Sequence, residues 1–438
     1  MKNSELSDFS LEYQSKTKQK HRQNLGQYFT VKSLRDIALE KLPKADNEEI
    51  NVVELTCGSG EFIDSILDKY PHARVEGYEI ELDLASHCKS KFVDRPNVGI
   101  FHVDTLQYHL SGGFVSNGKE KKYRFCIGNP PYFELEAEKI NDKDAPPTLG
   151  KKLREQYKDI INGRPNVYAL FIKLGIDLLE DGGYLSYVVP TSMLNGAYFS
   201  KLRDYIIHTC SIVDIVLKDD DHFEGALQNV MILVLKKCPN DGRFVFSYNG
   251  ITIFTPKWGE LKKTFSQAKT LCELGFKVKT GNVVWNQRKA DLSDDSDDTL
   301  LIWADNIVKN GFSLENHRTS AHEKTVEKKL VKKCQYIKNI KKSEKQMESA
   351  IVVNRISGVG ELASLRACLY NDKKDFVCEN HVNVITPTKD ACMTLEELLP
   401  HMRKWQAMEV IRSITGNTQV SKSELEKLFP IWLTDSKK

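Results

Sequence analysis

An apolar run that enters a glycine-rich turn and then a helical pattern constrains the fold of this chain more than any other feature. Residues 52–60 read Val-Val-Glu-Leu-Thr-Cys-Gly-Ser-Gly, and apolar residues recur at helical spacing from Phe62 to Leu67. A buried strand, a glycine-rich turn and a helix in this order open doubly wound α/β domains. Gly58 and Gly60 would let the backbone approach a ligand where a Cβ would collide. The segment therefore predicts a ligand-binding turn at the first strand of an α/β sheet.

The spacing of these glycines differs from that of a dinucleotide-binding turn. The pattern is not Gly-x-Gly-x-x-Gly, and Glu61 at the start of the helix would repel a phosphate. A ligand with a cationic centre and an amino-acid moiety suits this turn better. A second expected strand, residues 75–80, carries Glu79 near its end, where a carboxylate commonly holds ribose hydroxyls. A third, residues 98–103, leads into Asp104.

A fourth expected strand, residues 125–127, runs into Asn129, Pro130, Pro131 and Tyr132. The two prolines fix two backbone angles and donate no hydrogen bonds, so this segment forms a stiff bracket at the strand's carboxyl end. The amide oxygen of Asn129 and the carbonyl of Pro130 could accept both N–H bonds of a planar amino group while the Tyr132 ring stacks on its heterocycle. A plain turn after a buried strand is the alternative, because Asn-Pro often begins turns.

Taken in order, the turn, the acids after two strands and the Asn-Pro-Pro-Tyr segment resemble S-adenosylmethionine-dependent amino-methyltransferases. Residues 26–30, Gly-Gln-Tyr-Phe-Thr, resemble the N-terminal cofactor-lid motif of gamma-class adenine-N6 DNA methyltransferases of type II restriction–modification systems. The resemblance covers residues 1–240. It implies S-adenosylmethionine as the cofactor, double-stranded DNA as the substrate, and a Rossmann-like class I domain with a seven-stranded, mostly parallel sheet.

The resemblance also implies roles for particular residues. Residues 28–30 would cover the methionine end of the cofactor, Glu79 would hold the ribose, Ile80 would pack on the adenine and Asp104 would bind its amino group. The expected cofactor-binding residues are Tyr28, Phe29, Thr30, Glu54, Thr56, Cys57, Gly58, Gly60, Phe62, Glu79, Ile80, Asp104, Thr105, Asn129 and Pro131. The expected catalytic residues are Asn129, Pro130, Pro131, Tyr132 and Phe199. Phe199 would sandwich an extruded base, and packing into the core is the alternative for it. The Thr56-Cys57 pair departs from the Pro-Ala or Ala-Cys that is common in such proteins.

Later segments complete the expected architecture. Residues 164–179 predict a helix ended by Asp181-Gly182-Gly183, and residues 184–189, 212–217 and 230–235 predict the remaining strands of the sheet. Residues 134–163 predict a mobile loop that orders on substrate or, equally, an inert insertion. A turn cluster at residues 239–242 predicts a boundary between a catalytic domain, 1–240, and a target-recognition α+β domain, 241–438.

Composition and charge agree with this organisation. With 438 residues, 40% hydrophobic and 28% charged, the chain suits two globular domains. No run of about eighteen apolar residues occurs, and the N-terminus does not resemble a signal peptide, so no membrane segment and a cytoplasmic location are expected. The ten cysteines form no C-x-x-C pair, so no structural zinc or other metal is expected. No Pro-Cys dipeptide occurs, which argues against cytosine-C5 chemistry.

The second half of the chain is the more basic. Residues 246–438 carry 31 Lys/Arg and 24 Asp/Glu, a net charge of +7, whereas residues 1–245 have −4. A basic domain could dock a polyanion, although a solvated lysine-rich face explains the same numbers. The main basic run, 324–345, also fits an amphipathic surface helix. Residues 278–289 combine glycine, amides and cations and resemble target-recognition domains, and Ser421 with Glu424 predicts a helix cap.

The sequence therefore favours a site-specific DNA methyltransferase that acts on the N6 amino group of a flipped-out adenine. It would be the monomeric modification component of a restriction–modification system, with a restriction endonuclease acting at the same site. Cytosine-N4 methylation remains an alternative, because the same bracket could support it. Glutamine methylation on a release factor is a second alternative, and a DNA-binding subunit without catalysis is a third.

Overall fold

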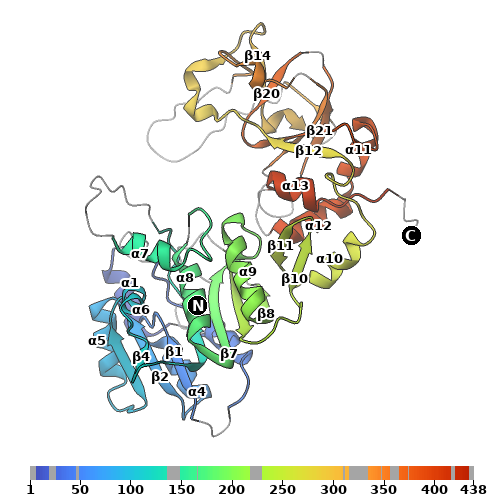
Figure 1. The fold of residues 1–438 in the computed structure, drawn as a ribbon. Helices are drawn as coiled ribbons and strands as arrows, with labels where there is room; N and C mark the ends of the chain where they lie inside the picture. The colour runs from blue at the N-terminus through green and yellow to red at the C-terminus, as the bar shows by residue number, and fades with distance from the viewer. Residues whose placement is uncertain are drawn as a thin grey trace. The chain divides into compact units, whose positions relative to one another are not determined.

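The computed structural model describes the chain except for residues 1–5, 19–25, 46–48, 136–147, 165, 218–228, 309–310, 315–333, 347, 356–364, 373, 416–419 and 434–438. The chain forms two compact units (Figure 1). The first comprises Met1–Phe246 and Thr252–Trp258, and the second comprises Ser247–Ile251 and Gly259–Lys438. The first unit thus runs past residue 240, where the sequence placed the boundary, and takes in half of the hairpin that follows.

A seven-stranded sheet forms the centre of the first unit, as expected. Its strands are β1 (Asn51–Glu54), β2 (Arg74–Glu79), β3 (Val98–His102), β6 (Tyr123–Gly128), β7 (Leu179–Pro190), β8 (Ser211–Leu217) and β9 (Val230–Lys236). Their order is β3-β2-β1-β6-β7-β9-β8, and β9 alone runs antiparallel to its two neighbours. The order reverses between β1 and β6, and ligands of such sheets bind where the carboxyl ends of these strands diverge.

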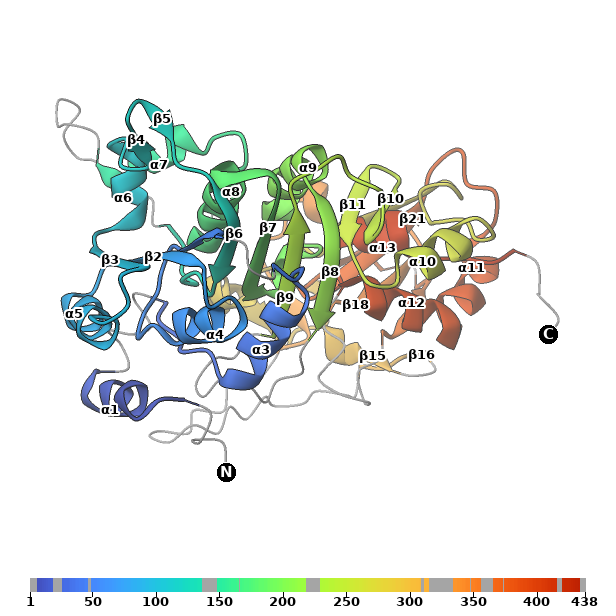
Figure 2. The ribbon, with the colours of Figure 1, turned by 90° about the horizontal axis from the view of Figure 1, so that it is seen from below.

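Helices cover both faces of this sheet (Figure 2). One apolar cluster joins it to α3 (Lys32–Glu40), α4 (Glu61–Lys69) and α5 (Leu82–Lys91). The other joins it to α6 (Thr105–Leu110), α7 (Leu149–Gln156), α8 (Val167–Leu178) and α9 (Ser200–Thr209). Val52 of β1 packs in the cluster with α3, α4 and α5, and Val53 packs in the cluster on the opposite face. The two differ because successive side chains of a strand alternate in direction. The first unit also contains α1 (Asp8–Lys16), a small hairpin of β4 (Val115–Ser116) and β5 (Lys119–Glu120), and short 3₁₀ turns η2 (Thr191–Met193) and η3 (Ala197–Phe199).

Two local expectations in the first unit were wrong. Asp181-Gly182-Gly183 does not end a helix, because α8 already stops at Leu178 and these residues lie within β7. Gly182 takes a positive φ of 79°, and its N–H donates to Lys237 O at 2.8 Å, so the glycines shape an irregular start of the strand. The described part of residues 134–163 is not a plain loop, since it contains α7.

The second unit mixes small sheets with helices, as the sequence predicted. One sheet has the order β12-β21-β18-β19 and another β13-β17-β14-β20. The strands of this region are β10 (Val245–Tyr248), β11 (Ile251–Phe254), β12 (Phe276–Thr280), β13 (Leu292–Ser293), β14 (Thr299–Ile302), β15 (Ile307–Val308), β16 (Gly311–Phe312), β17 (Tyr336–Ile337), β18 (Ala350–Asn354), β19 (Ala367–Tyr370), β20 (Phe376–Cys378) and β21 (Val382–Pro387). The helices are α10 (Trp258–Phe265), α11 (Leu395–Met402), α12 (Trp405–Thr415) and α13 (Lys422–Leu428), with 3₁₀ turns η5 (Trp285–Gln287), η6 (Lys289–Asp291), η7 (Ala304–Asn306) and η8 (Lys342–Glu344).

Some expectations about the second unit can be compared with the structure. The helix cap is confirmed, since Ser421 Oγ accepts from Glu424 N at 3.2 Å and the Glu424 carboxylate accepts from Ser421 N at 2.9 Å. Part of the basic run, 324–333, lies outside the described residues, and its remainder forms β17 and η8 instead of a surface helix. Arg288, one of the cations of the 278–289 segment, donates its Nε–H to the carboxylate of Asp291 at 2.8 Å.

Neither a membrane-spanning helix nor a cluster of metal ligands is found among the described residues. No helix there is long and apolar enough to cross a membrane. In the same part of the chain, no three His, Cys, Asp or Glu side chains gather as metal ligands would.

Candidate cofactor and active site

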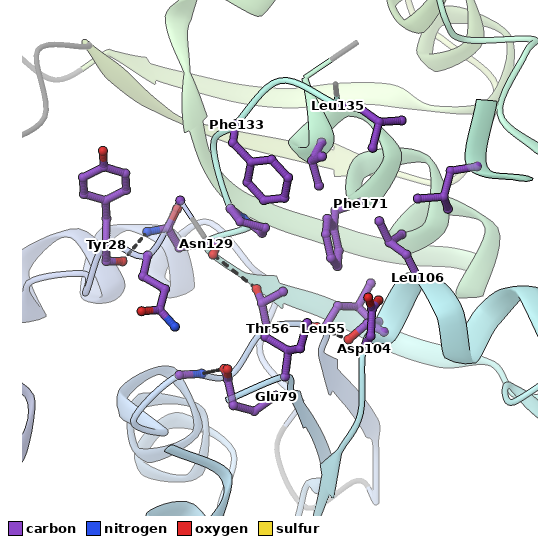
Figure 3. A pocket seen from close by; sticks show the side chains of 18 of the residues that line it. Tyr28, Leu55, Thr56, Glu79, Asp104, Leu106, Asn129, Phe133, Leu135 and Phe171 are labelled. Carbon is purple, nitrogen blue, oxygen red and sulfur yellow. Dashed lines mark hydrogen bonds between the residues drawn. The ribbon is translucent and has the colours of Figure 1, made fainter. Parts of the chain in front are cut away.

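A cavity of about 780 Å³ opens at the carboxyl edge of the sheet in the first unit. Residues from four successive strand ends surround it: Thr56 after β1, Glu79 at the end of β2, Asp104 after β3 and Asn129 after β6 (Figure 3). The structure thus brings together in one space residues that are spread over more than seventy positions of the sequence. The expected site residues that line this cavity are Tyr28, Phe29, Thr56, Gly58, Glu79, Ile80, Asp104, Thr105, Asn129 and Pro131.

The other expected site residues do not line the cavity. Most of them are buried around it: Thr30, Glu54, Cys57, Gly60, Phe62 and Pro130. Tyr132 is half-buried. Phe199 is buried in the apolar cluster of α8 and α9, where its ring stacks on Tyr168 with centroids 5.2 Å apart. The role of Phe199 beside an extruded base therefore stays a prediction, and in this state the ring belongs to the core.

The glycine-rich turn is fixed to the end of β2. Gly58 has a φ of 53° and Gly60 a φ of 76°, both in the left-handed region that favours glycine. The N–H of Gly58 donates to Glu79 Oε2 at 2.8 Å, and the N–H of Glu81 donates to the other carboxylate oxygen at 2.9 Å. Burial raises the pKa of Glu79. A Cβ on Gly60 would lie 2.7 Å from the ring of Phe92, so only glycine fits between the turn and α5.

The third strand end contributes a helix cap and a carboxylate. Asp104 Oδ1 accepts from the backbone N–H of Gln107 at 3.1 Å and so begins α6. Its carboxylate lies at the cavity (Figure 3). Thr105, next in sequence, donates its hydroxyl to Leu55 O at 2.7 Å and thereby ties α6 to the end of β1. Ile80 remains 47% exposed at the cavity, as expected of a side chain that covers a flat ligand.

The Asn-Pro-Pro-Tyr bracket lies directly against this turn. Thr56 donates its hydroxyl to the backbone carbonyl of Asn129 at 3.2 Å. The Asn129 amide nitrogen donates to Tyr28 O and to Thr30 Oγ1, each at 3.0 Å. The hydroxyl of Tyr132 contacts Asn129 Oδ1 and lies 2.8 Å from a second acceptor, Val188 O. Because a hydroxyl has one hydrogen, Tyr132 can donate to only one of these two oxygens at a time.

The lid segment, residues 26–30, packs on the bracket through backbone and ring. Gly26 has a φ of 59°, and a Cβ there would lie 2.4 Å from Tyr132 N. The rings of Tyr28 and Tyr132 stack with centroids 5.9 Å apart and planes at 24°. The segment that the sequence identified as a cofactor lid is therefore in contact with the expected catalytic residues.

Sequence reasoning missed the network that holds the lid. Glu61, interpreted there only as unfavourable to phosphate, is a buried acceptor. Its Oε1 accepts from Ser7 N, Ser7 Oγ and Ser10 Oγ at 2.9, 2.8 and 2.7 Å, and its Oε2 pairs with Arg35 Nη1 at 3.0 Å. The same guanidinium donates to the carbonyl of Thr30. The only sequence signal was an acid at a helix start, where the helix dipole favours one.

Sequence reasoning also missed most of the apolar wall of the cavity. The structure adds Leu55, Leu84, Leu106, Phe133, Leu135, Leu149, Leu153, Val167 and Phe171. Leu135, Leu149 and Leu153 come from the 134–163 segment, so its described part contributes to the wall of the cavity. The mixture of an apolar wall with a few polar groups is typical of cofactor sites.

The residues present fit a large ligand that carries an amino-acid end. Among the described residues, the buried polar atoms without a hydrogen-bond partner include Gln27 Oε1 at the cavity and Glu54 Oε2 at the end of β1. Buried polar atoms normally have partners, so such atoms call for a donor. Burial holds the pKa of Glu54 well above its ordinary value. A cationic amino group in the cavity would supply a hydrogen-bond donor to Gln27 Oε1.

The strand order, the antiparallel β9, and the turn and carboxylates at the carboxyl edge define a Rossmann-like α/β domain with its ligand cavity where the strand order reverses. Residues 63–223 match the family model described as Eco57I restriction-modification methylase.

The chain is also similar to individual proteins. The Type II methyltransferase M.CvrRI of Paramecium bursaria Chlorella virus XZ-6E is 27% identical over 69% of this chain and 74% of its own length. The modification methylase CviBIII of Paramecium bursaria Chlorella virus NC1A is 26% identical over 50% of this chain and 52% of its own. A solved structure of a class I S-adenosylmethionine-dependent methyltransferase from Listeria monocytogenes aligns over 53% of this chain and 66% of that chain, with 18% identity and a TM-score of 0.41.

Proposed function

We propose that this protein methylates the N6 amino group of a flipped-out adenine at a specific site in double-stranded DNA, with S-adenosylmethionine as donor. It would be the modification component of a restriction–modification system, with a restriction endonuclease acting on the same site. The type II methyltransferases among its relatives support this assignment. We further propose that it works as a monomer in the cytoplasm and that the second unit recognises the target sequence.

One observation carries the proposal: Asn129 lies at the same cavity as the glycine-rich turn, and its backbone carbonyl accepts a hydrogen bond of 3.2 Å from the Thr56 hydroxyl of that turn. A methyl donor held by the turn and an amino group held by Asn129 would therefore be neighbours. Such proximity can lower a barrier by several kcal/mol.

The chemistry of an aromatic amine explains why a carboxamide suits this position. The lone pair of the adenine amino group is delocalised into the ring, so this nitrogen is a poor nucleophile. Acceptors at Asn129 Oδ1 and the Pro130 carbonyl would draw its two N–H bonds out of the ring plane and localise the lone pair. Hydrogen bonds of this kind are strongest where water is excluded. The bound S-adenosylmethionine supplies the electrophilic methyl group.

Base extrusion sets the second requirement. Taking a base out of a duplex costs a few kcal/mol, and stacking on an aromatic ring returns about 1–3 kcal/mol per base. Tyr132 is the aromatic side chain of the bracket. Its ring stacks on Tyr28 with centroids 5.9 Å apart and makes an edge-to-face contact with Tyr168 at 6.0 Å. A flipped base would have to take the place of one of these contacts.

Transfer of a labelled methyl group tests the proposal. Purified protein is mixed with tritiated S-adenosylmethionine and unmethylated bacterial DNA, and the DNA is digested to nucleosides and separated. Label in N6-methyladenine supports the proposal, whereas label in N4-methylcytosine supports the cytosine alternative. Label that enters a release-factor glutamine supports the protein alternative, and no transfer to either substrate supports a binding subunit. DNA from cells that express the protein is the matched control, because its sites would already be modified and would take up no label.

A further inference from the structure

We propose that Thr30 is a positioning residue for the methyl acceptor: its hydroxyl fixes the Asn129 carboxamide in the orientation that presents Oδ1 to the substrate amine. This inference rests on the proposed amine-gripping role of Asn129 and adds a role that the lid motif alone does not suggest. The sequence had placed Thr30 against the cofactor, whereas the structure buries it at 5% exposure outside the cavity lining.

An asparagine side chain has two faces that differ chemically, an oxygen that accepts and a nitrogen that donates. If the amide rotated by half a turn, the nitrogen would face the substrate amine and repel its N–H bonds. The bracket alone does not prevent this rotation, because the prolines fix the backbone and leave the side-chain amide free to turn. Catalysis by Asn129 therefore needs a separate device that selects one orientation.

The lid supplies that device through two acceptors. Tyr28 O, a carbonyl that can only accept, lies 3.0 Å from Asn129 Nδ2, and Thr30 Oγ1 lies 3.0 Å from the same nitrogen. With both amide N–H bonds satisfied by the lid, Oδ1 is the face left for an incoming amine. Tyr132 donates to this oxygen here, but its hydroxyl also lies 2.8 Å from Val188 O. Donation to Val188 would release Oδ1 for the substrate without moving the ring.

Thr30 is itself held by a buried ion pair. Arg35 donates to the Thr30 carbonyl and forms an ion pair with Glu61. The Glu61 side chain is only 7% exposed, and the Arg35 side chain is 9% exposed. The Nε of Arg35 donates to Ser65 Oγ at 3.1 Å. A buried guanidinium that donates to several partners is rigid, because each further hydrogen bond fixes the same planar group. The backbone carbonyl of Thr30 is therefore tied to α4 through Arg35 and Glu61.

Thr30→Val tests the role, since valine keeps the shape and loses the acceptor. We expect kcat to fall about 10- to 100-fold, as for a misplaced catalytic group, with the dissociation constant of S-adenosylmethionine within about twofold of the wild type. Thr30→Ser, which restores the hydroxyl, should return kcat to within about threefold. Thr255→Val is the matched control, because Thr255 is equally buried, accepts the N–H of Lys257 at 3.1 Å and lies outside the site.

The outcomes separate this role from others. An unchanged kcat in Thr30→Val overturns the proposal, and so does a loss confined to cofactor affinity, which would make Thr30 a cofactor residue. If the wild type methylates cytosine or glutamine, the proposed function fails, and the same comparison is made with that acceptor. If the wild type transfers no methyl group, crystal structures of Thr30→Val and of the wild type test whether Thr30 orients the Asn129 amide. An Asn129 amide in the same orientation with the same occupancy in both overturns the role, and a turned or disordered amide in the variant supports it.

Discussion

Gly26→Ala should disconnect the lid from the catalytic bracket. A Cβ at residue 26 would lie 2.4 Å from Tyr132 N and 3.1 Å from Pro131 C, and both are backbone atoms that no side-chain rotation can move away. Since ordinary contact begins at 3.4 Å, the lid and the bracket would have to separate by about 1 Å. The lid acceptors would then move away from the Asn129 amide by a similar distance.

The size of the effect follows from two contributions. A left-handed alanine costs about 1–2 kcal/mol in stability wherever it is placed. A displacement of about 1 Å at a reacting group can lower the rate about 100-fold, which corresponds to about 2.7 kcal/mol in the barrier. We therefore expect kcat/KM of Gly26→Ala to fall about 100-fold, well beyond what the stability loss produces in a protein that remains folded.

Single-turnover transfer from tritiated S-adenosylmethionine to unmethylated DNA measures this effect, and circular dichroism checks the fold. Gly118→Ala is the matched control: Gly118 has a φ of 74°, yet a Cβ there would meet nothing within 4 Å. This variant has the same conformational strain without the collision and should keep wild-type turnover. A Gly26→Ala protein with kcat/KM within threefold of Gly118→Ala would refute the reasoning, because the lid and the bracket would then be shown to work independently.

Three further changes probe the cavity and the buried residues around it. Asn129→Ala should lower turnover by more than about 1000-fold while cofactor affinity, measured by calorimetry, stays close to wild type; turnover within tenfold would exclude the amine-gripping role. Asp104→Asn keeps the oxygen that caps α6 but should weaken S-adenosylmethionine binding about tenfold or more, and an unchanged dissociation constant would remove Asp104 from the site. Burial raises the pKa of Glu54 well above its ordinary 4.5. Between these two pKa values the folded protein keeps a proton that the unfolded chain releases. The free energy of unfolding therefore falls as the pH rises from the unfolded pKa to the folded pKa. Glu54→Gln, which has no proton to lose, should gain thermal stability over wild type as pH rises above about 4.5; a difference that does not change with pH would contradict this assignment.

The parts of the fold that the sequence predicted correctly depend on local patterns. The first strand, its glycine turn and the amphipathic α4 are adjacent in sequence, and each strand of the sheet is a short apolar run. The carboxylates after β2 and β3 follow from the same logic, because parallel strands end at one edge. Nine expected residues besides Asn129 therefore line the cavity.

The remainder depends on contacts that no local pattern reveals. Asn129 meets Thr30 across 99 positions and Tyr28 across 101. Glu61 was interpreted through its charge alone, whereas its function as an acceptor depends on Ser7 and Ser10, which lie 54 and 51 residues away. Phe199 has spacing that suits either a core helix or a binding surface, and periodicity does not distinguish these.

The division of the β10–β11 hairpin bears on how the catalytic part can be prepared alone. The chain passes from one unit to the other three times between Phe246 and Gly259, so a single cut after residue 240 would discard a segment that completes the first unit. That segment supplies Thr252 O, which accepts from the buried Arg203, and Phe254 N, which donates to Leu194 O. An expression fragment that ends at Trp258 keeps both bonds. Crystallisation or cofactor-binding trials of the isolated unit should begin with this fragment.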